Sequence, residues 1–226
     1  MKRAAIVPLA VALVAIGCGG SGGGGSEVTI DQLAGKMAAA YCAKAYQCCN
    51  QEELAQLQGE DFTDEASCTT YYTSLIEQFL VTPMRSAIDA GRGSYDAAKA
   101  GKCIDAFEAL GCTGSNDPNT FFDNCETPYV GLQGEGAECA NNLECQSGLY
   151  CSSGKTCSAY LSSGETCGGN SEPYCGQGLY CDTGTTTCTQ MKNVGDDCTS
   201  AVECSTFNCD DTTHKCVERP QVCTGQ

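Results

Sequence analysis

Cysteine is the residue type in this sequence with the most scope for chemistry, and the 226 residues contain 21 of them. Cysteine thiolates can bind zinc, but zinc sites usually use cysteine pairs about two to four residues apart, and no C-x-x-C pattern occurs. The same absence removes the usual signature of a thioredoxin-like redox enzyme. Disulfide bonds are therefore the preferred interpretation, with no metal or cofactor expected, and they predict an oxidising compartment.

The first residues have the three parts of a bacterial export signal. Lys2 and Arg3 form a short positive region, residues 4–16 form an apolar run, and a glycine precedes Cys18. The run is too short to span a bilayer and contains a proline, so a transmembrane helix is the weaker interpretation. The ending resembles the lipobox of bacterial lipoproteins. This resemblance implies that residues 1–17 are a signal peptide and that Cys18 carries the lipid, whereas an ordinary signal peptide is the alternative.

Residues 18–27 consist mostly of glycine and serine, which predicts a flexible tether. With Cys18 lipidated, 21 − 1 = 20 cysteines remain, an even number that suits a disulfide framework. We therefore expect a protein anchored through Cys18 in the bacterial cell envelope, at the outer membrane or the cell surface.

The chain is strongly acidic, with a formal net charge of −16. Removal of Lys2 and Arg3 with the signal gives −16 − 2 = −18. A surface of this charge repels nucleic acid and anionic lipid headgroups, so neither is an expected partner. Solubility is the simplest role of the charge.

Residues 28–130 predict an all-α helical bundle braced by cysteines. Thr29 and Gln32 have the form of a capping box, and apolar residues then recur at three- and four-residue steps. A short helix is expected over residues 51–58. A bundle of this length can bury a modest core.

A second long helix is expected from near Thr63, with Phe79 among its inward-facing residues and a kink or restart at Pro83. The glycines of residues 91–93 predict a break. Ser94 is a favourable N-cap for a third helix.

The helical region contains an odd number of cysteines: Cys42, Cys48, Cys49, Cys68, Cys103, Cys112 and Cys125. Cys42 and Cys49 would lie roughly 10.5 Å apart along one helix, too far to bridge. We expect the later four to pair with the first three, with the exact pairs left open. The leftover cysteine is expected to bond Cys223, in the C-terminal tail of residues 218–226.

From residue 134 the composition changes to glycine, serine, threonine, asparagine and cysteine, and a four-cysteine pattern occurs three times. Unit one covers residues 134–160, unit two residues 161–190 and unit three residues 192–217. Their first cysteines are 167 − 139 = 28 and 198 − 167 = 31 residues apart. Units this small cannot bury a core, so we expect three short β-hairpins stapled by disulfides. The predicted fold class is an all-α bundle followed by small disulfide-rich repeats.

Residues 142–151, NLECQSGLYC, resemble the C-x-x-G-x-x-C signature of Dickkopf N-terminal and colipase-like cysteine-rich modules. The resemblance covers about residues 134–217. The whole layout of lipobox, cysteine-bearing helical region and such modules is similar to lipoproteins of myxobacterial type. That similarity implies no particular activity.

Four cysteines allow three pairings in each unit. Sequential pairing would leave the hairpin unattached to the first half of its unit, nested pairing would close one loop inside another, and interleaved pairing would tie both halves together. Interleaved order is what the colipase-like resemblance implies. It pairs Cys139 with Cys151, Cys145 with Cys157, Cys167 with Cys181, Cys175 with Cys188, Cys198 with Cys209, and Cys204 with Cys216.

Residues able to support catalysis are few. His214 is the only histidine and lies in a polar segment, which indicates a solvated turn residue rather than a general base. The sequence contains no G-x-S-x-G, H-E-x-x-H or phosphate-binding glycine loop. The paired acids 196–197 and 210–211 lack the alternating spacing of a calcium loop.

A third hypothesis is an enzyme that acts through carboxylates, with the acid pairs 52–53 and 64–65 as the candidate catalytic groups. These acids lie at expected helix starts, where the helix dipole already explains them. The tyrosines of the two GLYC motifs, Tyr150 and Tyr180, are candidate exposed contact residues, although packing over a disulfide explains them equally well.

The leading hypothesis is a non-enzymatic, lipid-anchored envelope protein whose modules bind an envelope or extracellular protein or a glycan. The alternative is an inhibitor or cofactor of a secreted hydrolase.

Overall fold

The computed structural model describes residues 27–58, 64–112, 125–169, 171–218 and 223. The export signal, Cys18 and Thr63 lie outside these residues. In the described part, helices predominate in the first half and two-stranded antiparallel sheets in the second. No helix among the described residues is long and apolar enough to cross a membrane. The fold therefore belongs to the expected general class, helices combined with small disulfide-rich sheets.

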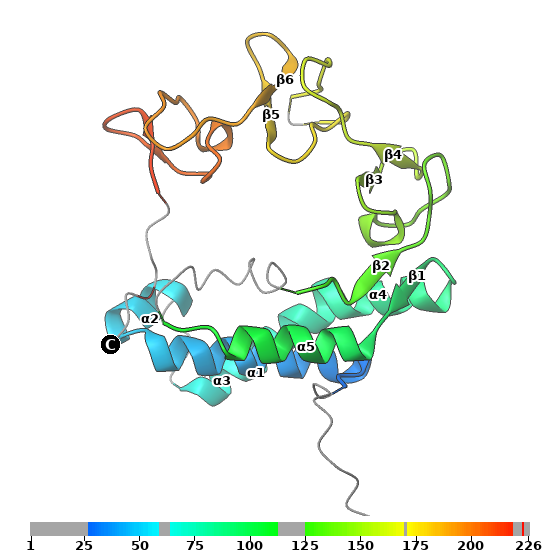
Figure 1. Ribbon diagram of the computed structural model, residues 1–226, viewed down its shortest axis with the longest axis vertical. Helices are drawn as coiled ribbons and strands as arrows, with labels where there is room; N and C mark the ends of the chain where they lie inside the picture. The colour runs from blue at the N-terminus through cyan, green and yellow to red at the C-terminus, as the bar shows by residue number, and fades with distance from the viewer. Residues whose placement is uncertain (1–26, 59–63, 113–124, 170, 219–222, 224–226) are drawn as a thin grey trace, which may run out of the picture.

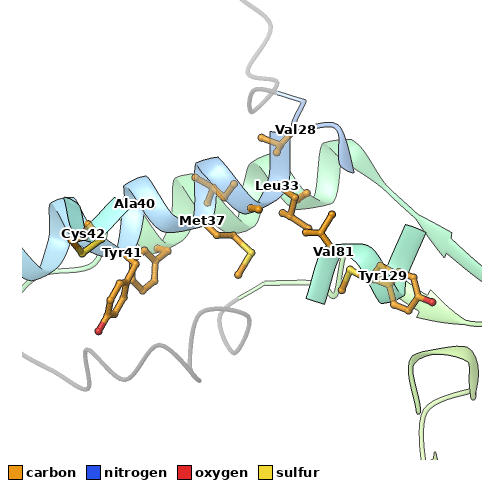
Figure 2. Close-up of a cluster of buried hydrophobic side chains, with 14 of the residues drawn as sticks. Val28, Leu33, Met37, Ala40, Tyr41, Cys42, Val81 and Tyr129 are labelled. Atoms are coloured by element: carbon orange, nitrogen blue, oxygen red, sulfur yellow. A yellow bond between two sulfur atoms is a disulfide. The ribbon is translucent and has the colours of Figure 1, made fainter. Parts of the chain in front are cut away.

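Helix α1 (Ile30–Cys48) is the central element of the helical region. It begins with the expected capping box, in which the backbone N–H of Thr29 donates to Gln32 Oε1 at 3.1 Å. Its buried face packs mainly on α3 (Glu65–Ile76) and α5 (Ala97–Glu108). Figure 2 shows Leu33 of α1 beside Val81 in this core.

Helix α3 continues through a π-helical segment, η2 (Glu77–Val81), into α4 (Thr82–Asp89). Pro83 lies in the first turn of α4, directly after the π-helical segment, and has no N–H to donate to the preceding turn. The expected inward position of Phe79 is wrong, because its side chain is 68% exposed and Val81 is fully buried. The π-helical turn holds more residues than an α-helical turn, so it rotates the buried face away from Phe79.

The helical region is not all-α. Strand β1 (Gly93–Tyr95) pairs antiparallel with β2 (Tyr129–Gly131), with Ser94 opposite Val130. Ser94 is therefore a strand residue and not the expected N-cap. Asp96 caps α5 instead, accepting hydrogen bonds from the backbone N–H groups of Ala98 and Lys99, each at 3.0 Å. The sequence pattern missed this sheet because its strands are three residues long and their paired residues are at least 129 − 95 = 34 positions apart in the chain.

Within residues 134–217, consecutive short strands pair antiparallel. The pairs are β3 (Leu149–Cys151) with β4 (Cys157–Ala159), β5 (Leu179–Asp182) with β6 (Thr187–Gln190), and β7 (Cys209–Asp210) with β8 (Lys215–Cys216). In each pair a third cysteine lies opposite a fourth, as Cys151 does to Cys157. Two 3₁₀ turns, η4 (Asn142–Glu144) and η5 (Ala201–Glu203), precede the second cysteine of units one and three.

Unit one continues directly from the β1–β2 sheet. The N–H of Leu132 donates to the carbonyl of Arg92 at 3.0 Å, and the N–H of Gln133 donates to that of Glu144 at 2.8 Å. The chain after β2 therefore bonds the helical region on one side and unit one on the other. Figure 1 shows the units following one another from β2 in an arc above the helices.

Candidate functional site

Every cysteine in the described part of the chain is in a disulfide bond. In the helical region the pairs are Cys42–Cys68, Cys48–Cys112 and Cys103–Cys125, with Cα separations of 6.0, 5.1 and 5.2 Å. The first two join α1 to later segments, as expected.

The Cys103–Cys125 bond was not expected, because both cysteines belong to the later four. The chain entering β2 runs back along α5, where Lys99 Nζ lies 3.0 Å from Glu126 Oε2 and the carbonyl of Pro128 accepts from the Asp96 N–H at 2.8 Å. This return path brings residue 125 beside Cys103.

Each unit contains two crossed disulfides that follow the interleaved order. They are Cys139–Cys151 and Cys145–Cys157, Cys167–Cys181 and Cys175–Cys188, and Cys198–Cys209 and Cys204–Cys216. Their Cα separations run from 5.5 to 6.0 Å, the ordinary range for a disulfide. The crossed bonds form the interior of each unit, as in unit one, where Cys139, Cys145 and Cys157 are buried together.

Crossed disulfides bring three sulfur atoms within 4.8 Å of one another in every unit. Such a cluster has the size of a metal site. Zinc, however, requires thiolates with a free lone pair and charge, and each of these sulfur atoms is bonded to another sulfur. These sulfur clusters are therefore formed by disulfide bonds and make up the interior of each unit.

The tail cysteine, Cys223, bonds Cys49 with a Cα separation of 4.6 Å. Cys49 follows the last residue of α1, and both cysteines are buried beside Cys48 and Ala45. The bond joins the segment after unit three to the helical region, so the units are attached covalently at both ends.

The same backbone hydrogen bonds recur around the second cysteine of each unit. A residue at the start of each unit, or directly before it, donates its N–H to the carbonyl of the residue before that cysteine: Gln133 to Glu144 at 2.8 Å, Leu161 to Tyr174 at 2.9 Å and Lys192 to Glu203 at 2.7 Å. His214 belongs to another recurring feature. Its backbone φ of 52° matches those of Lys155 and Thr186, two residues before the fourth cysteine, so His214 is a left-handed turn residue.

Two buried glutamates in these units were missed by the sequence analysis. Glu144 is 0% exposed, and its Oε2 accepts from the Ala140 N–H at 2.7 Å and lies 3.1 Å from Arg92 Nε. Its Oε1 has no hydrogen-bond partner among the described residues. Burial and the negative charge of Glu144 both raise the pKa of the neighbouring Tyr129 hydroxyl.

Glu203 occupies the equivalent position in unit three. Its carboxylate accepts from Lys192 Nζ and from the Thr199 hydroxyl, and these bonds lower its pKa. The sequence contains a pattern that could have indicated both residues. A glutamate precedes the second cysteine in units one and three but not in unit two. Glu144 therefore contacts both unit one and the helical region, whereas Glu203 makes its contacts within unit three.

The expected exposure of Tyr150 is wrong, since its side chain is 4% exposed. Its ring packs against Tyr160 and Tyr174, with centroid distances of 5.0 and 5.1 Å. Tyr160 follows β4 and Tyr174 belongs to unit two, so these three rings join units one and two. Tyr180 is half-buried.

Several of the acids considered for catalysis or calcium have structural roles. Asp64 caps α3 by accepting from the Ser67 N–H at 2.7 Å, which lowers the pKa of Asp64, and Glu53 accepts from the Asn50 N–H at 2.9 Å at the start of α2 (Gln51–Gln58). Asp210 accepts from the N–H of Thr213 at 2.6 Å in the β7–β8 turn. These contacts use the carboxylates as caps and turn acceptors.

Two neighbouring clefts among the described residues are large enough to hold a ligand. The first, of about 510 Å³, lies between the helical region and unit one, with Met84, Val130, Leu143 and Leu149 in its walls. The second, of about 780 Å³, has walls from all three units, including Leu179, Met191 and Phe207. Tyr160 lines both clefts. Both volumes lie within the range of roughly 300–1,000 Å³ that is typical of ligand sites.

Comparison with protein families, curated proteins and solved structures found no match to this chain.

Proposed function

We propose that this protein is a lipid-anchored component of the bacterial cell envelope that presents disulfide-stapled units for binding a protein or a glycan, without enzymatic activity. The observation that carries the proposal is the pair of clefts whose walls come from the helical region and the three units. Crossed disulfides constrain each unit internally, and the Cys49–Cys223 bond attaches the segment after unit three to the helical region. A preformed cleft binds at a lower entropic cost than one that must be ordered on binding.

The units are proposed to be three copies of one β-hairpin module, similar to Dickkopf N-terminal and colipase-like modules. The interleaved bonds, the opposed third and fourth cysteines, and the shared backbone hydrogen bonds support this proposal. Repetition of a rigid module with varied surface residues is a common way to build an extended binding face.

The proposed anchor rests on the sequence around Cys18. Replacement Cys18→Ser is expected to move the protein from the membrane fraction to the soluble fraction, because the diacylglyceryl group has no other acceptor thiol. Mass spectrometry of the wild-type N-terminal peptide should show the lipid. Unchanged membrane partitioning of Cys18→Ser would contradict the anchor while leaving the clefts untouched.

Affinity capture from envelope extract tests the binding role. Oxidised wild-type protein should retain a partner that a Leu179→Arg variant loses, because a charge in the second cleft opposes any ligand seated there. Exposed Phe79 lines neither cleft, so Phe79→Arg is the matched control and should retain the partner. Equal capture by both variants, or by neither, contradicts binding through the clefts. A hydrolase as the captured partner would favour the inhibitor or cofactor role instead.

A further inference from the structure

The walls of the two clefts include the same turn from each unit. This turn joins the second cysteine to the third, and it comprises residues 146–148 in unit one, 176–178 in unit two and 205–207 in unit three. Gln146 and Ser147 line the first cleft, and Gly148 lines the second together with residues of the other two turns. Equivalent turns from the three units therefore line two clefts that share Tyr160.

Among the described residues, none that lines either cleft is charged. The chain carries 28 acidic and 12 basic residues, so an uncharged surface of this extent is unusual for this molecule. An ionic ligand would find no counter-charge in the walls, and a polyanion would in addition be repelled by the net charge of −16. The site therefore favours an uncharged ligand.

The walls also contain neutral polar side chains whose hydrogen-bond donors and acceptors are available to a ligand. Ser147, Gln177 and Ser205 are exposed, and their side chains make no hydrogen bond within the described part of the chain. Asn142 uses its Oδ1 to accept from the Cys151 N–H at 2.8 Å, which leaves its amide N–H groups available. A ligand with many hydroxyl groups can use these donors and acceptors, whereas a purely apolar chain cannot.

Two partly exposed aromatic residues accompany the polar groups. Tyr160 is 38% exposed and Phe207 is 53% exposed, and both line the second cleft. The negative face of an aromatic ring packs well on the C–H face of a pyranose ring. Rings of this kind beside neutral hydrogen-bonding groups form a suitable subsite for sugars.

We infer that the two clefts bind a neutral, linear glycan, whose sugar units follow the equivalent turns of successive units. This inference rests on the proposed binding function and specifies its ligand. Aromatic faces bind the sugar rings, serine and glutamine side chains bind the hydroxyls, and the absence of charge excludes uronic-acid and sulfated polymers. A second ligand class, an uncharged apolar peptide, fits the volumes but leaves the polar groups unpaired.

Titration calorimetry with the oxidised full chain tests the inference. The probes are neutral oligosaccharides of glucose, mannose and N-acetylglucosamine, with oligogalacturonate as an acidic comparator and an uncharged leucine-rich peptide as an apolar one. At least one neutral oligosaccharide should bind, with an affinity nearly independent of salt because no ion pairs form. Oligogalacturonate should bind more weakly than its neutral counterparts.

Two pairs of variants locate the binding. Phe207→Leu keeps apolar area but removes the ring face, and Gln177→Ala removes a hydrogen-bonding group, so each should weaken glycan binding roughly three- to tenfold. The matched controls Phe79→Leu and Gln78→Ala alter exposed residues outside both clefts and should bind like wild type.

Two outcomes of the oligosaccharide titrations overturn the inference, and a third comes from the peptide. Failure of every neutral oligosaccharide to bind is one, and equal losses in the cleft variants and their controls is the other. Peptide binding that Phe207→Leu leaves intact also overturns it, yet would retain the proposed binding role. Loss of capture in the extract experiment would instead remove the binding role itself.

Discussion

At the scale of single residues, buried charges hold the elements of this small protein together. Lys44 of α1 is 6% exposed, and its Nζ donates to the carbonyls of Glu108 and Leu110 at 2.8 and 2.6 Å. These carbonyls lie at the C-terminal end of α5, where the helix dipole favours a cation. One side chain thus donates to two carbonyls and fixes α1 against the end of α5.

Replacement Lys44→Met tests this role. The variant keeps the apolar stem but removes the donors, so both carbonyls lose their partner, and we expect a loss of about 2 kcal/mol in the free energy of unfolding. Denaturant unfolding followed by circular dichroism measures it. Lys36→Met on the exposed face of α1 is the control and should change stability by less than about 0.5 kcal/mol. Similar values for the two variants would show that the Lys44 bonds contribute little.

Gly131 shows how closely unit one approaches the β1–β2 sheet. A Cβ at this position would lie 2.2 Å from the carbonyl oxygen of Cys145 and 2.6 Å from that of Leu143, and neither backbone atom can move alone. Gly131→Ala should therefore destabilise the protein by about 1–3 kcal/mol and loosen unit one.

The control for Gly131→Ala is Gly35→Ala in the interior of α1, where nothing lies within 4 Å of the added Cβ. That substitution should raise stability by roughly 0.5–1 kcal/mol because alanine favours the helix. Thermal unfolding and limited proteolysis between β2 and unit one compare the two. If Gly131→Ala left both thermal stability and the rate of proteolysis unchanged, unit one would be shown to dock loosely.

At the scale of elements, unit three depends on ionised carboxylates as well as on disulfides. Lys192 and Thr199 lower the pKa of Glu203, the Lys215 side chain lowers that of Asp197, and the Thr213 N–H lowers that of Asp210. Each bond requires the carboxylate form of the acid. A depressed pKa stabilises the folded state above the unfolded pKa, and this stabilisation is lost as the pH falls through the folded pKa.

We therefore expect the thermal stability of unit three to fall on acidification below the ordinary carboxyl values of 4.5 for glutamate and 3.8 for aspartate. Amide chemical shifts of Thr199 and Thr213, followed by NMR through this range, report the loss locally. Glu203→Gln should remove the change at Thr199 but preserve that at Thr213. A pH-independent Thr199 signal in the wild type would contradict the assigned role of Glu203.

At the scale of the whole molecule, the arc of units is attached to the helical region at both ends. The β2 segment and Glu144 attach unit one, and the Cys49–Cys223 bond attaches the segment after unit three. Tyr150, Tyr160 and Tyr174 join units one and two between these ends. Fixing both ends limits the movement of the cleft walls.

The double variant Cys49→Ala/Cys223→Ala tests the covalent attachment without leaving a free thiol. Helix α1 keeps its Cys48–Cys112 bond, so circular dichroism should be unchanged. Small-angle scattering should show a larger radius of gyration, because the last unit is then held only through its neighbours. An unchanged scattering curve would show that non-covalent contacts alone maintain the arc.

The sequence by itself determined the features that depend on local spacing. The capping box of α1, the helix over residues 51–58 and the break at residues 91–93 follow from neighbouring residues, and the structure has each of them. The odd cysteine count of the helical region required a partner elsewhere, which the structure provides in Cys223. The clefts could not be predicted, because their walls come from segments far apart in the chain.

Only the tertiary structure decided how distant segments meet. The β1–β2 sheet joins strands too short to leave a periodic pattern, the π-helical turn reverses the facing of Phe79, and Tyr150 is buried by rings from other segments. Glu144 is an ordinary polar residue in sequence and becomes a buried ion-pair partner only when unit one docks beside Arg92. Burial and pairing depend on long-range packing, and this is why local propensity does not reveal them.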